Sequence, residues 1–388
     1  MKVARWAHYG WMMASAVAVG LQAGPFGDFY PLGIWGVPRA EDLAVVRAAG
    51  FNLAFGPLSA RYLQAANALG IKVLAVPWQL TPPKFEKDKA WRSLRRYDSH
   101  PALWAWLMAE EPDLHLVAPQ EVRAWRQFLG CAQTRKPTAL VIFQGYSALD
   151  YGHLTDVILV DRYPIPWLPL ANFGQHVRAA RLAVGLQKPL VSVIQAFDWT
   201  YYPEQLQGQS NLRPPSWQEI RCMTYCALAE RADGLLYYAF DDGRWQMQAH
   251  PDTWTALCAV LREVNERLPL FKAEHLWWGK NHRFADRSIM FNAALQSSIT
   301  SVLLRVGAGD GNVPAGEYVL AVNNTEKRHL YGFTSPWKGA EKVTVLGEAR
   351  VLLSREGWLT DEFLPYAVHV YGPGTGPAKE AGHDRNGP

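Results

Sequence analysis

Acidic side chains stand where short apolar segments of this 388-residue chain end. Glu110 and Glu111 close one such segment, and Asp161 closes another. Enzymatic cleavage of a glycosidic bond uses two carboxyl groups, one protonated and one ionised. These acids therefore indicate acid–base chemistry on a sugar, provided that the fold brings them together.

Glu111 is the strongest candidate for the catalytic acid. Adjacent side chains on a strand point to opposite faces, so regular β-structure would let only one of Glu110 and Glu111 face inward. Pro112 ends the strand directly after them. Burial beside a second carboxylate would raise the pKa of Glu111, as a general acid requires. The alternative is that both glutamates are solvated loop acids.

Aromatic residues are abundant, with 17 Trp and 16 Tyr. Trp35, Trp78 and Trp199 lie at segment ends and could stack on sugar rings, because an indole face is large and stiff. The alternative is that the Trp side chains pack the core. Asp241 could bind a sugar hydroxyl or cap the following loop. The expected substrate-binding residues are Trp35, Trp78, Glu110, Tyr163, Gln195, Asp198, Trp199, Tyr238 and Asp241.

Short β-rich segments alternate with amphipathic helical segments between residues 29 and 271. The expected strands are Tyr30–Val37, Phe51–Phe55, Ile71–Val76, Ala102–Ala109, Thr138–Phe143, Asp156–Val160, Pro189–Gln195 and Gly234–Phe240. The expected helices are Glu41–Ala49, Arg61–Leu69, Lys84–Tyr97, Pro119–Ala132, Ala148–Leu154, Phe173–Val184, Ser216–Arg231 and Asp252–Arg267.

Eight β-α units in residues 28–273 predict an α/β fold, a closed (β/α)₈ TIM barrel. The runner-up is an open doubly wound sheet. That fold usually has a glycine-rich phosphate loop after its first strand, and none is present; the glycine-rich segments 307–311 and 372–376 do not sit between a strand and a helix. In a barrel the strand ends meet on one face, which would gather the acids and aromatics described above.

Residues 274–373 change to short strands separated by turn residues, which predicts a small antiparallel β-sandwich. The expected strands there are Ser288–Phe291, Ser301–Arg305, Tyr318–Asn323, Val343–Leu346, Val351–Ser354 and Ala367–Tyr371. Residues 374–388 are rich in Gly, Pro and charge, and we expect them to be disordered.

Residues 1–27 resemble a signal peptide: Lys2 and Arg5 precede an apolar run to Leu21, and small residues lie near Ala23. We therefore expect a secreted or periplasmic protein. A buried or disordered N-terminal strip is the alternative. The apolar run is shorter than the ~20 residues of a transmembrane helix, so we expect no membrane association of the mature form.

The composition excludes further classes. With 49% hydrophobic and 19% charged residues the chain is of a folded type. A net charge of +4 without a basic run argues against nucleic acid. The four cysteines form no C-x-x-C pair, and we expect them to be buried thiols. One disulfide could form if the protein is exported. His115 follows Glu111 by four residues, but without a third ligand at suitable spacing we expect neither metal nor cofactor.

Trp104-Ala-Trp-Leu-Met-Ala-Glu-Glu-Pro112 resembles the fourth-strand signature of clan A-type glycoside hydrolases and their uncharacterised relatives. There an Asn-Glu-Pro or Asp-Glu-Pro triplet carries the acid/base, and Glu111 is the matching residue. Segments 156–164, 221–240 and 366–371 are similar to the sixth strand, the last helix–strand unit and the accessory sandwich of the same group. The resemblance covers most of residues 28–373. It implies a barrel hydrolase acting on β-linked or otherwise equatorial glycans.

The sequence departs from that clan at its nucleophile, a Glu that ends the seventh strand. Gln195 stands at or beside that place, and a neutral amide cannot form a glycosyl ester. Asp161 or Asp198 could supply the second carboxylate, the substrate's N-acetyl group could assist, or the barrel could bind carbohydrate without cleaving it. We favour a carboxylate, with Asp161 first, although Asp161 could instead pair with a rim arginine. The separation of the Glu111 and Asp161 carboxyl groups would distinguish two mechanisms of hydrolysis. About 5–5.5 Å indicates retention of the anomeric configuration, and about 6.5–9.5 Å indicates its inversion.

Overall fold

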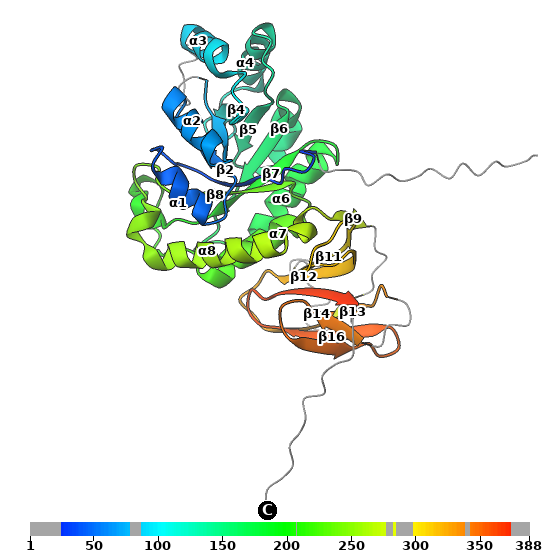
Figure 1. Cartoon of the computed structure of the whole chain (residues 1–388). Helices are drawn as coiled ribbons and strands as arrows, with labels where there is room; N and C mark the ends of the chain where they lie inside the picture. The colour runs from blue at the N-terminus through cyan, green and yellow to red at the C-terminus, as the bar shows by residue number, and fades with distance from the viewer. Residues whose placement is uncertain are drawn as a thin grey trace, which may run out of the picture.

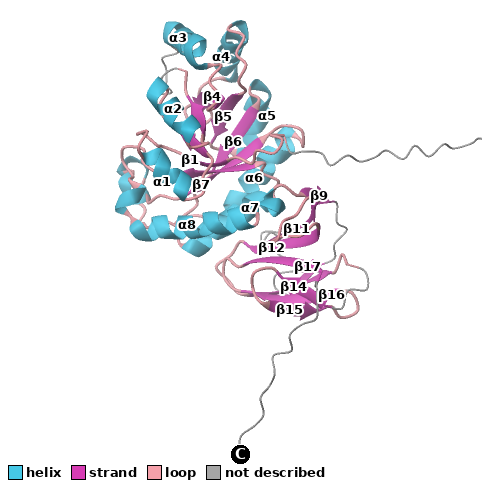
Figure 2. Cartoon of the chain, viewed as in Figure 1, coloured by secondary structure: helices cyan, strands magenta, loops and turns pink. Residues whose placement is uncertain are grey.

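The computed structural model describes residues 25–77, 87–206, 208–276, 282–284, 298–337 and 342–373. A barrel comes first in the chain and two antiparallel sheets follow it (Figure 1, Figure 2). Trp78, most of the signal-like segment, the expected strand Ser288–Phe291 and the C-terminal tail lie outside the described residues.

Eight parallel strands close the barrel in sequence order, because β1 pairs with both β2 and β8. This confirms the predicted fold class. The strands are β1 Leu32–Ile34, β2 Leu53–Phe55, β3 Lys72–Ala75, β4 Leu103–Glu110, β5 Thr138–Ile142, β6 Val157–Asp161, β7 Leu190–Gln195 and β8 Gly234–Tyr238.

Helices cover the outside of the barrel (Figure 2). They are α1 Asp42–Ala48, α2 Ala60–Ala68, α3 Lys87–Tyr97, α4 Pro119–Cys131, α5 Ala148–Tyr151, α6 Ala171–Val184, α7 Trp217–Ala229, α8 Pro251–Glu266 and α9 Leu268–Phe271. Short 3₁₀ turns occur at η1 Gly145–Ser147, η2 Gly152–Leu154, η3 Trp199–Tyr201, η4 Pro203–Gln205 and η5 Met247–Ala249. None of the helices described is both long and apolar enough to span a bilayer.

Local sequence explains where several elements begin and end. Ser216 and Glu219 form a reciprocal capping box that starts α7. Strand β6 reads Val-Ile-Leu-Val-Asp and is buried along its whole length, as expected of a strand covered on both faces. Gly36 follows β1 with φ +75, and a Cβ there would lie 2.3 Å from the carbonyl oxygen of Asp241. Glycine therefore lets the segments after β1 and β8 meet at the barrel mouth.

The C-terminal region contains a six-stranded sheet of order β15-β14-β17-β12-β11-β9 and a three-stranded sheet of order β10-β13-β16. Their apolar faces share a core that includes Val319, Phe333 and Leu359. The strands are β9 Glu274–Leu276, β10 His282–Phe284, β11 Ile299–Val306, β12 Gly316–Asn323, β13 His329–Thr334, β14 Lys342–Val345, β15 Arg350–Leu353, β16 Trp358–Phe363 and β17 Val368–Pro373. The sequence analysis missed β9, β10, β13 and β16.

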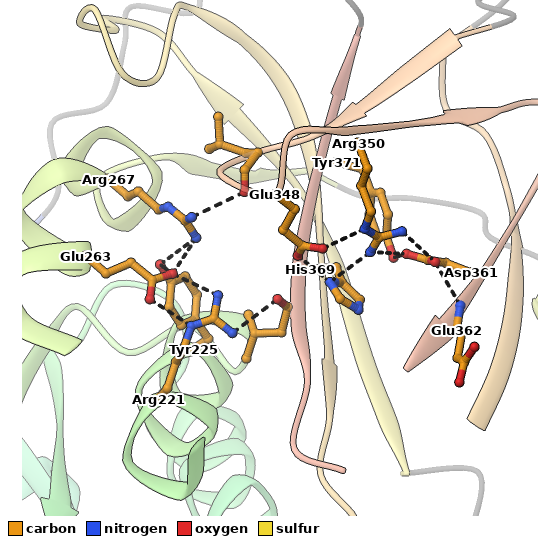
Figure 3. A network of polar contacts seen from close by, with 12 residues as sticks. Arg221, Tyr225, Glu263, Arg267, Glu348, Arg350, Asp361, Glu362, His369 and Tyr371 are labelled. Atoms are coloured by element: carbon orange, nitrogen blue, oxygen red, sulfur yellow. Dashed lines mark hydrogen bonds and ion pairs between the residues drawn. The ribbon is translucent and has the colours of Figure 1, made fainter. Parts of the chain in front are cut away.

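The six-stranded sheet packs on the barrel, since Leu304, Leu320 and Val370 belong to the same apolar cluster as the barrel core. A polar network borders this contact (Figure 3). Arg221 on α7 makes two hydrogen bonds to the Glu263 carboxylate and a third to the carbonyl of Val368. Tyr225 and Arg267 also bind Glu263. All four cysteines are free thiols.

Candidate active site

The end of β4 departs from regular β-geometry. The pairing of β4 with β5 shifts register between Leu107 and Ala109, and Glu111 has a left-handed φ of 45. The backbone of Glu111 still donates to Val141 on β5, at 3.0 Å. The strand alternation is interrupted here, and Glu110 and Glu111 both lie near enough to Asp161 to raise its pKa.

Asp161 completes this group from the last position of β6, where its side chain is only 4% exposed. Its carboxyl lies within hydrogen-bonding reach of the Glu111 carboxyl. Asp161 Oδ1 accepts no hydrogen bond from an N–H or O–H of the described residues. The expected alternative, an ion pair between Asp161 and a rim arginine, is not formed within the described part of the chain.

Burial raises the pKa of Asp161 well above its ordinary value, and the charge and hydrogen bond of Glu111 raise it further. Burial also raises the pKa of Glu111, whereas its hydrogen bond with Asp161 lowers it. Two desolvated carboxyls in contact cannot both ionise near neutral pH, so the pair shares one proton. Glu111 is partly exposed, whereas Asp161 is almost fully buried. Glu111 is therefore the member that a substrate would meet.

Glu110 adds a third carboxyl. Its pKa is raised to about 8, chiefly by burial and then by the charges of Glu111 and Asp242. Near neutral pH Glu110 therefore favours its protonated form. Together with the Glu111–Asp161 pair, which shares one proton, this gives the site both a proton donor and an anion.

Asp242 organises the aromatic side of the site, although sequence analysis singled out its neighbour Asp241 instead. Asp242 Oδ2 accepts from Tyr202 at 2.5 Å and from Tyr238 at 2.6 Å. Its Oδ1 accepts from the backbone N–H groups of Arg244 and Trp245. Asp241 accepts from the backbone of Gly243, which is the loop-capping role that the sequence analysis left open. The signal that could have found Asp242 was its own place in the same Asp-Asp-Gly turn.

Gln195 and Asp198 have structural partners. The Gln195 amide is fully buried, and it accepts from the N–H and donates to the carbonyl of Ile165, both at 2.8 Å. This pairing pins the loop after β6 and leaves Gln195 without the free amide that sugar binding would use. Asp198 accepts from the backbone and hydroxyl of Thr200, capping the turn η3. Asp198 is not among the groups that shift the pKa values of Glu110, Glu111 and Asp161.

A continuous aromatic wall stands beside the acids. Trp35 contacts Tyr238, Tyr238 contacts Tyr163, and Tyr163 contacts Trp199, with ring centroids 6.0, 5.5 and 6.3 Å apart. Tyr163 also hydrogen-bonds Asp161, which ties the wall to the acids. Trp35 is 6% exposed and stacks on Phe55, as a packing residue does. Trp199 is partly exposed and stacks on Trp167, a residue that the sequence analysis missed.

Within the described ranges, no three His, Cys, Asp or Glu side chains group as metal ligands would. His115 donates its backbone N–H to the Glu111 carbonyl. Burial raises the pKa of the Glu111 carboxyl, and the nearby His115 ring opposes this rise.

No protein-family model matches the chain, and no curated protein does either. Solved structures do. One described as a glycoside hydrolase has a TM-score of 0.57 at 11% identity, covering 88% of this chain and 92% of the other. A glycoside hydrolase family 5 protein from Bacteroides vulgatus gives 0.56 at 12% identity, covering 88% of each chain. The chain has the fold of glycoside hydrolases.

An α-amylase from Geobacillus thermoleovorans, solved with acarbose, matches with a TM-score of 0.52 at 10% identity, covering 86% of this chain and 90% of the other. The fold is thus shared with structures described as glycoside hydrolases and with one described as an α-amylase. At these identities the likeness establishes the architecture, and the argument for activity comes from the acid group itself.

Proposed function

We propose that the protein is a glycoside hydrolase in which Glu111 is the general acid and Asp161 holds its proton. The observation that carries the proposal is the buried Glu111–Asp161 pair at the carboxyl ends of barrel strands, where active sites of this fold lie. A carboxyl kept protonated near neutral pH beside an anion is the combination that glycoside cleavage uses.

The proposed reaction begins when Glu111 transfers the shared proton to the glycosidic oxygen as the C1–O bond breaks. The pair would then carry two negative charges, which is costly unless a positive charge develops beside it. The sugar ring becomes oxocarbenium-like at that moment and supplies that charge. Water completes the hydrolysis by adding its hydroxyl to C1, and its remaining proton returns to the Glu111–Asp161 pair.

The contact between Glu111 and Asp161 is closer than the carboxyl separations of about 5–5.5 Å or 6.5–9.5 Å that distinguish retaining from inverting enzymes. Asp161 therefore stands beside Glu111 rather than across the scissile bond from it. We assign Asp161 as a proton-holding partner, and Glu110 as the nearest further carboxyl. The resemblance of residues 104–112 to the clan signature supports a β-linked or otherwise equatorial glycan as substrate, and the signal-like N-terminus supports action outside the cytoplasm.

A second candidate is a barrel that binds carbohydrate without cleaving it. The observation in its favour is Gln195, whose buried amide is fully engaged by Ile165 and Phe197 where the clan has its nucleophile. The aromatic wall would serve a binding protein equally well. The two candidates differ in whether the bound glycan is hydrolysed.

The test is release of reducing ends from a panel of purified glycans by the full chain and by Glu111→Gln and Asp161→Asn. Asp198→Asn is the matched control, because it removes a carboxylate that only caps a turn. We expect activity in the wild type and the control, and strong losses in the two site variants. Glycan binding without turnover in every protein would instead establish the binding candidate.

A further inference from the structure

Arg162, the residue after Asp161, is a half-buried cation. Among the described residues its side chain donates a hydrogen bond only to a neutral group. Its Nε donates to Asn172 Oδ1 at 2.7 Å, and its guanidinium lies 4.8 Å from the centroid of the Phe143 ring. No carboxylate of the described residues forms an ion pair with it. Its terminal nitrogens have no hydrogen-bond partner there either.

The charged groups near Arg162 make no direct bond to it among the described residues. Asp113 accepts with both carboxylate oxygens from the backbone N–H groups of Phe143 and Gln144. His176 accepts from the N–H of Gly145, and burial together with the charge of Arg162 lowers its pKa to about 4, so it is uncharged. Asp161 is close enough to act on Arg162, but its charge is shared with a proton and with Glu111.

A half-buried guanidinium that makes no direct ion pair is a favourable place for an anion to bind. Its planar fork matches a carboxylate or a sulfate. Asn172, which holds Arg162, lies in the first turn of the 14-residue helix α6, where the helix dipole also favours an anion. Tyr146, whose hydroxyl is near enough to influence Arg162, is 60% exposed and offers a further donor.

We propose that Arg162 makes the site selective for glycans that carry an anionic group, a uronic-acid carboxylate or a sulfate ester, next to the bond bound at Glu111. The inference rests on the proposed function, because that function places the sugar at the acid pair. Arg162 is a specificity residue here and takes no part in proton transfer.

The experiment measures the affinity of full-length Glu111→Gln, which should bind without consuming its ligand, for three sets of oligosaccharides. The sets are neutral cello-oligosaccharides, oligogalacturonates and sulfated carrageenan oligosaccharides, so that the last two separate carboxylate from sulfate. Arg162→Gln is added to that background, and Arg162→Met keeps an apolar stem over Phe143 in case Gln disturbs folding. Arg95→Gln is the matched control. Arg95 is an exposed residue in the last turn of α3, so this substitution removes the same charge at a place away from the strand ends.

We expect one anionic set to bind at least about tenfold more tightly than the neutral set, and both Arg162 variants to lose that preference. The Arg95 control should keep it. Tightest binding of neutral oligosaccharides, binding of none of the sets, or equal losses in the Arg162 and Arg95 variants would overturn the inference. Hydrolysis of neutral glycans without anionic preference would leave the proposed function intact. Anionic glycans that bind through Arg162 but are never cleaved by the wild type would overturn the proposed function instead.

Discussion

The carboxyl groups of Glu111 and Asp161 lie in hydrogen-bonding contact although β5 separates their strands, β4 and β6, in the barrel wall. The contact determines their chemistry, because two desolvated acids in contact favour the state in which the pair retains one proton.

Replacing Asp161 by Asn should move the alkaline limb of the pH dependence of kcat to lower pH, by about one unit or more. The physical reason is that the pair releases its last proton only at high pH, because that release leaves two negative charges in contact, whereas Glu111 beside a neutral amide donor would ionise alone. The measurement is kcat against pH for the wild type and Asp161→Asn. A variant with lower kcat but an unmoved alkaline limb would show that Asp161 only supports the fold.

Replacing Glu110 by Gln should stabilise the protein at alkaline pH. The pKa of Glu110 is raised to about 8 by burial, so the native state keeps a proton that the unfolded chain loses above its ordinary pKa near 4.5. Stability from this group is full below pH 4.5 and falls as the pH rises to about 8. We expect Glu110→Gln to exceed the wild type by on the order of a few kcal/mol at pH 8–9 and to match it at pH 4.

Chemical denaturation at several pH values checks the Glu110 prediction. Equal stability of the two proteins at pH 8–9 would contradict the burial of an acid at this position. A loss of stability at every pH would show that Gln disturbs the packing instead.

Trp35 and Trp199 should respond differently to truncation. Trp35 is almost fully buried against Phe55, so Trp35→Ala should cost about 3–5 kcal/mol of stability. Trp199 is partly exposed beside Tyr163, so Trp199→Ala should weaken glycan binding by about 1–3 kcal/mol. Paired thermal melts and affinity titrations distinguish the two. If both variants melt early and neither changes affinity while folded, the aromatic wall belongs to the core alone.

Glu263 should be essential to the contact between the barrel and the C-terminal sheets. Glu263 is 16% exposed and is the carboxylate partner of both Arg221 and Arg267, so Glu263→Gln leaves two largely buried cations without that counter-ion. We expect a loss of about 3–5 kcal/mol. Glu274→Gln is the control, because its ion pair with Arg305 is long, at 3.6 Å, and about half exposed. It should cost less than about 1 kcal/mol, and equal losses in denaturation would refute the distinction.

The barrel could be predicted from the sequence because each apolar strand, such as Val157–Asp161, is followed by an amphipathic helix. Two of the missed strands have local causes: Gly332 interrupts β13, and the alternating polar residues of β16 resemble a turn-rich loop. A glycine removes the side chain that a strand pattern depends on, and short edge strands carry a weak signal.

The site was only partly predictable for a different reason. The end of β4 contains a register shift and a left-handed residue, Glu111, and an argument from regular strand alternation cannot anticipate either. Asp242 and Trp167 act through partners far away in the sequence, Tyr202 and Trp199. The engagement of Gln195 by Ile165 likewise appears only when β7 and the loop after β6 are brought together.

The most direct test of the account is the turnover of Glu111→Gln on whichever glycan the wild type hydrolyses. General acid catalysis contributes about 10²–10⁴-fold, so we predict that kcat falls by at least about two orders of magnitude. The amide occupies the same volume and can still bond Asp161, so the melting temperature should not fall. A correctly folded Glu111→Gln protein with near-wild-type kcat would contradict the central claim.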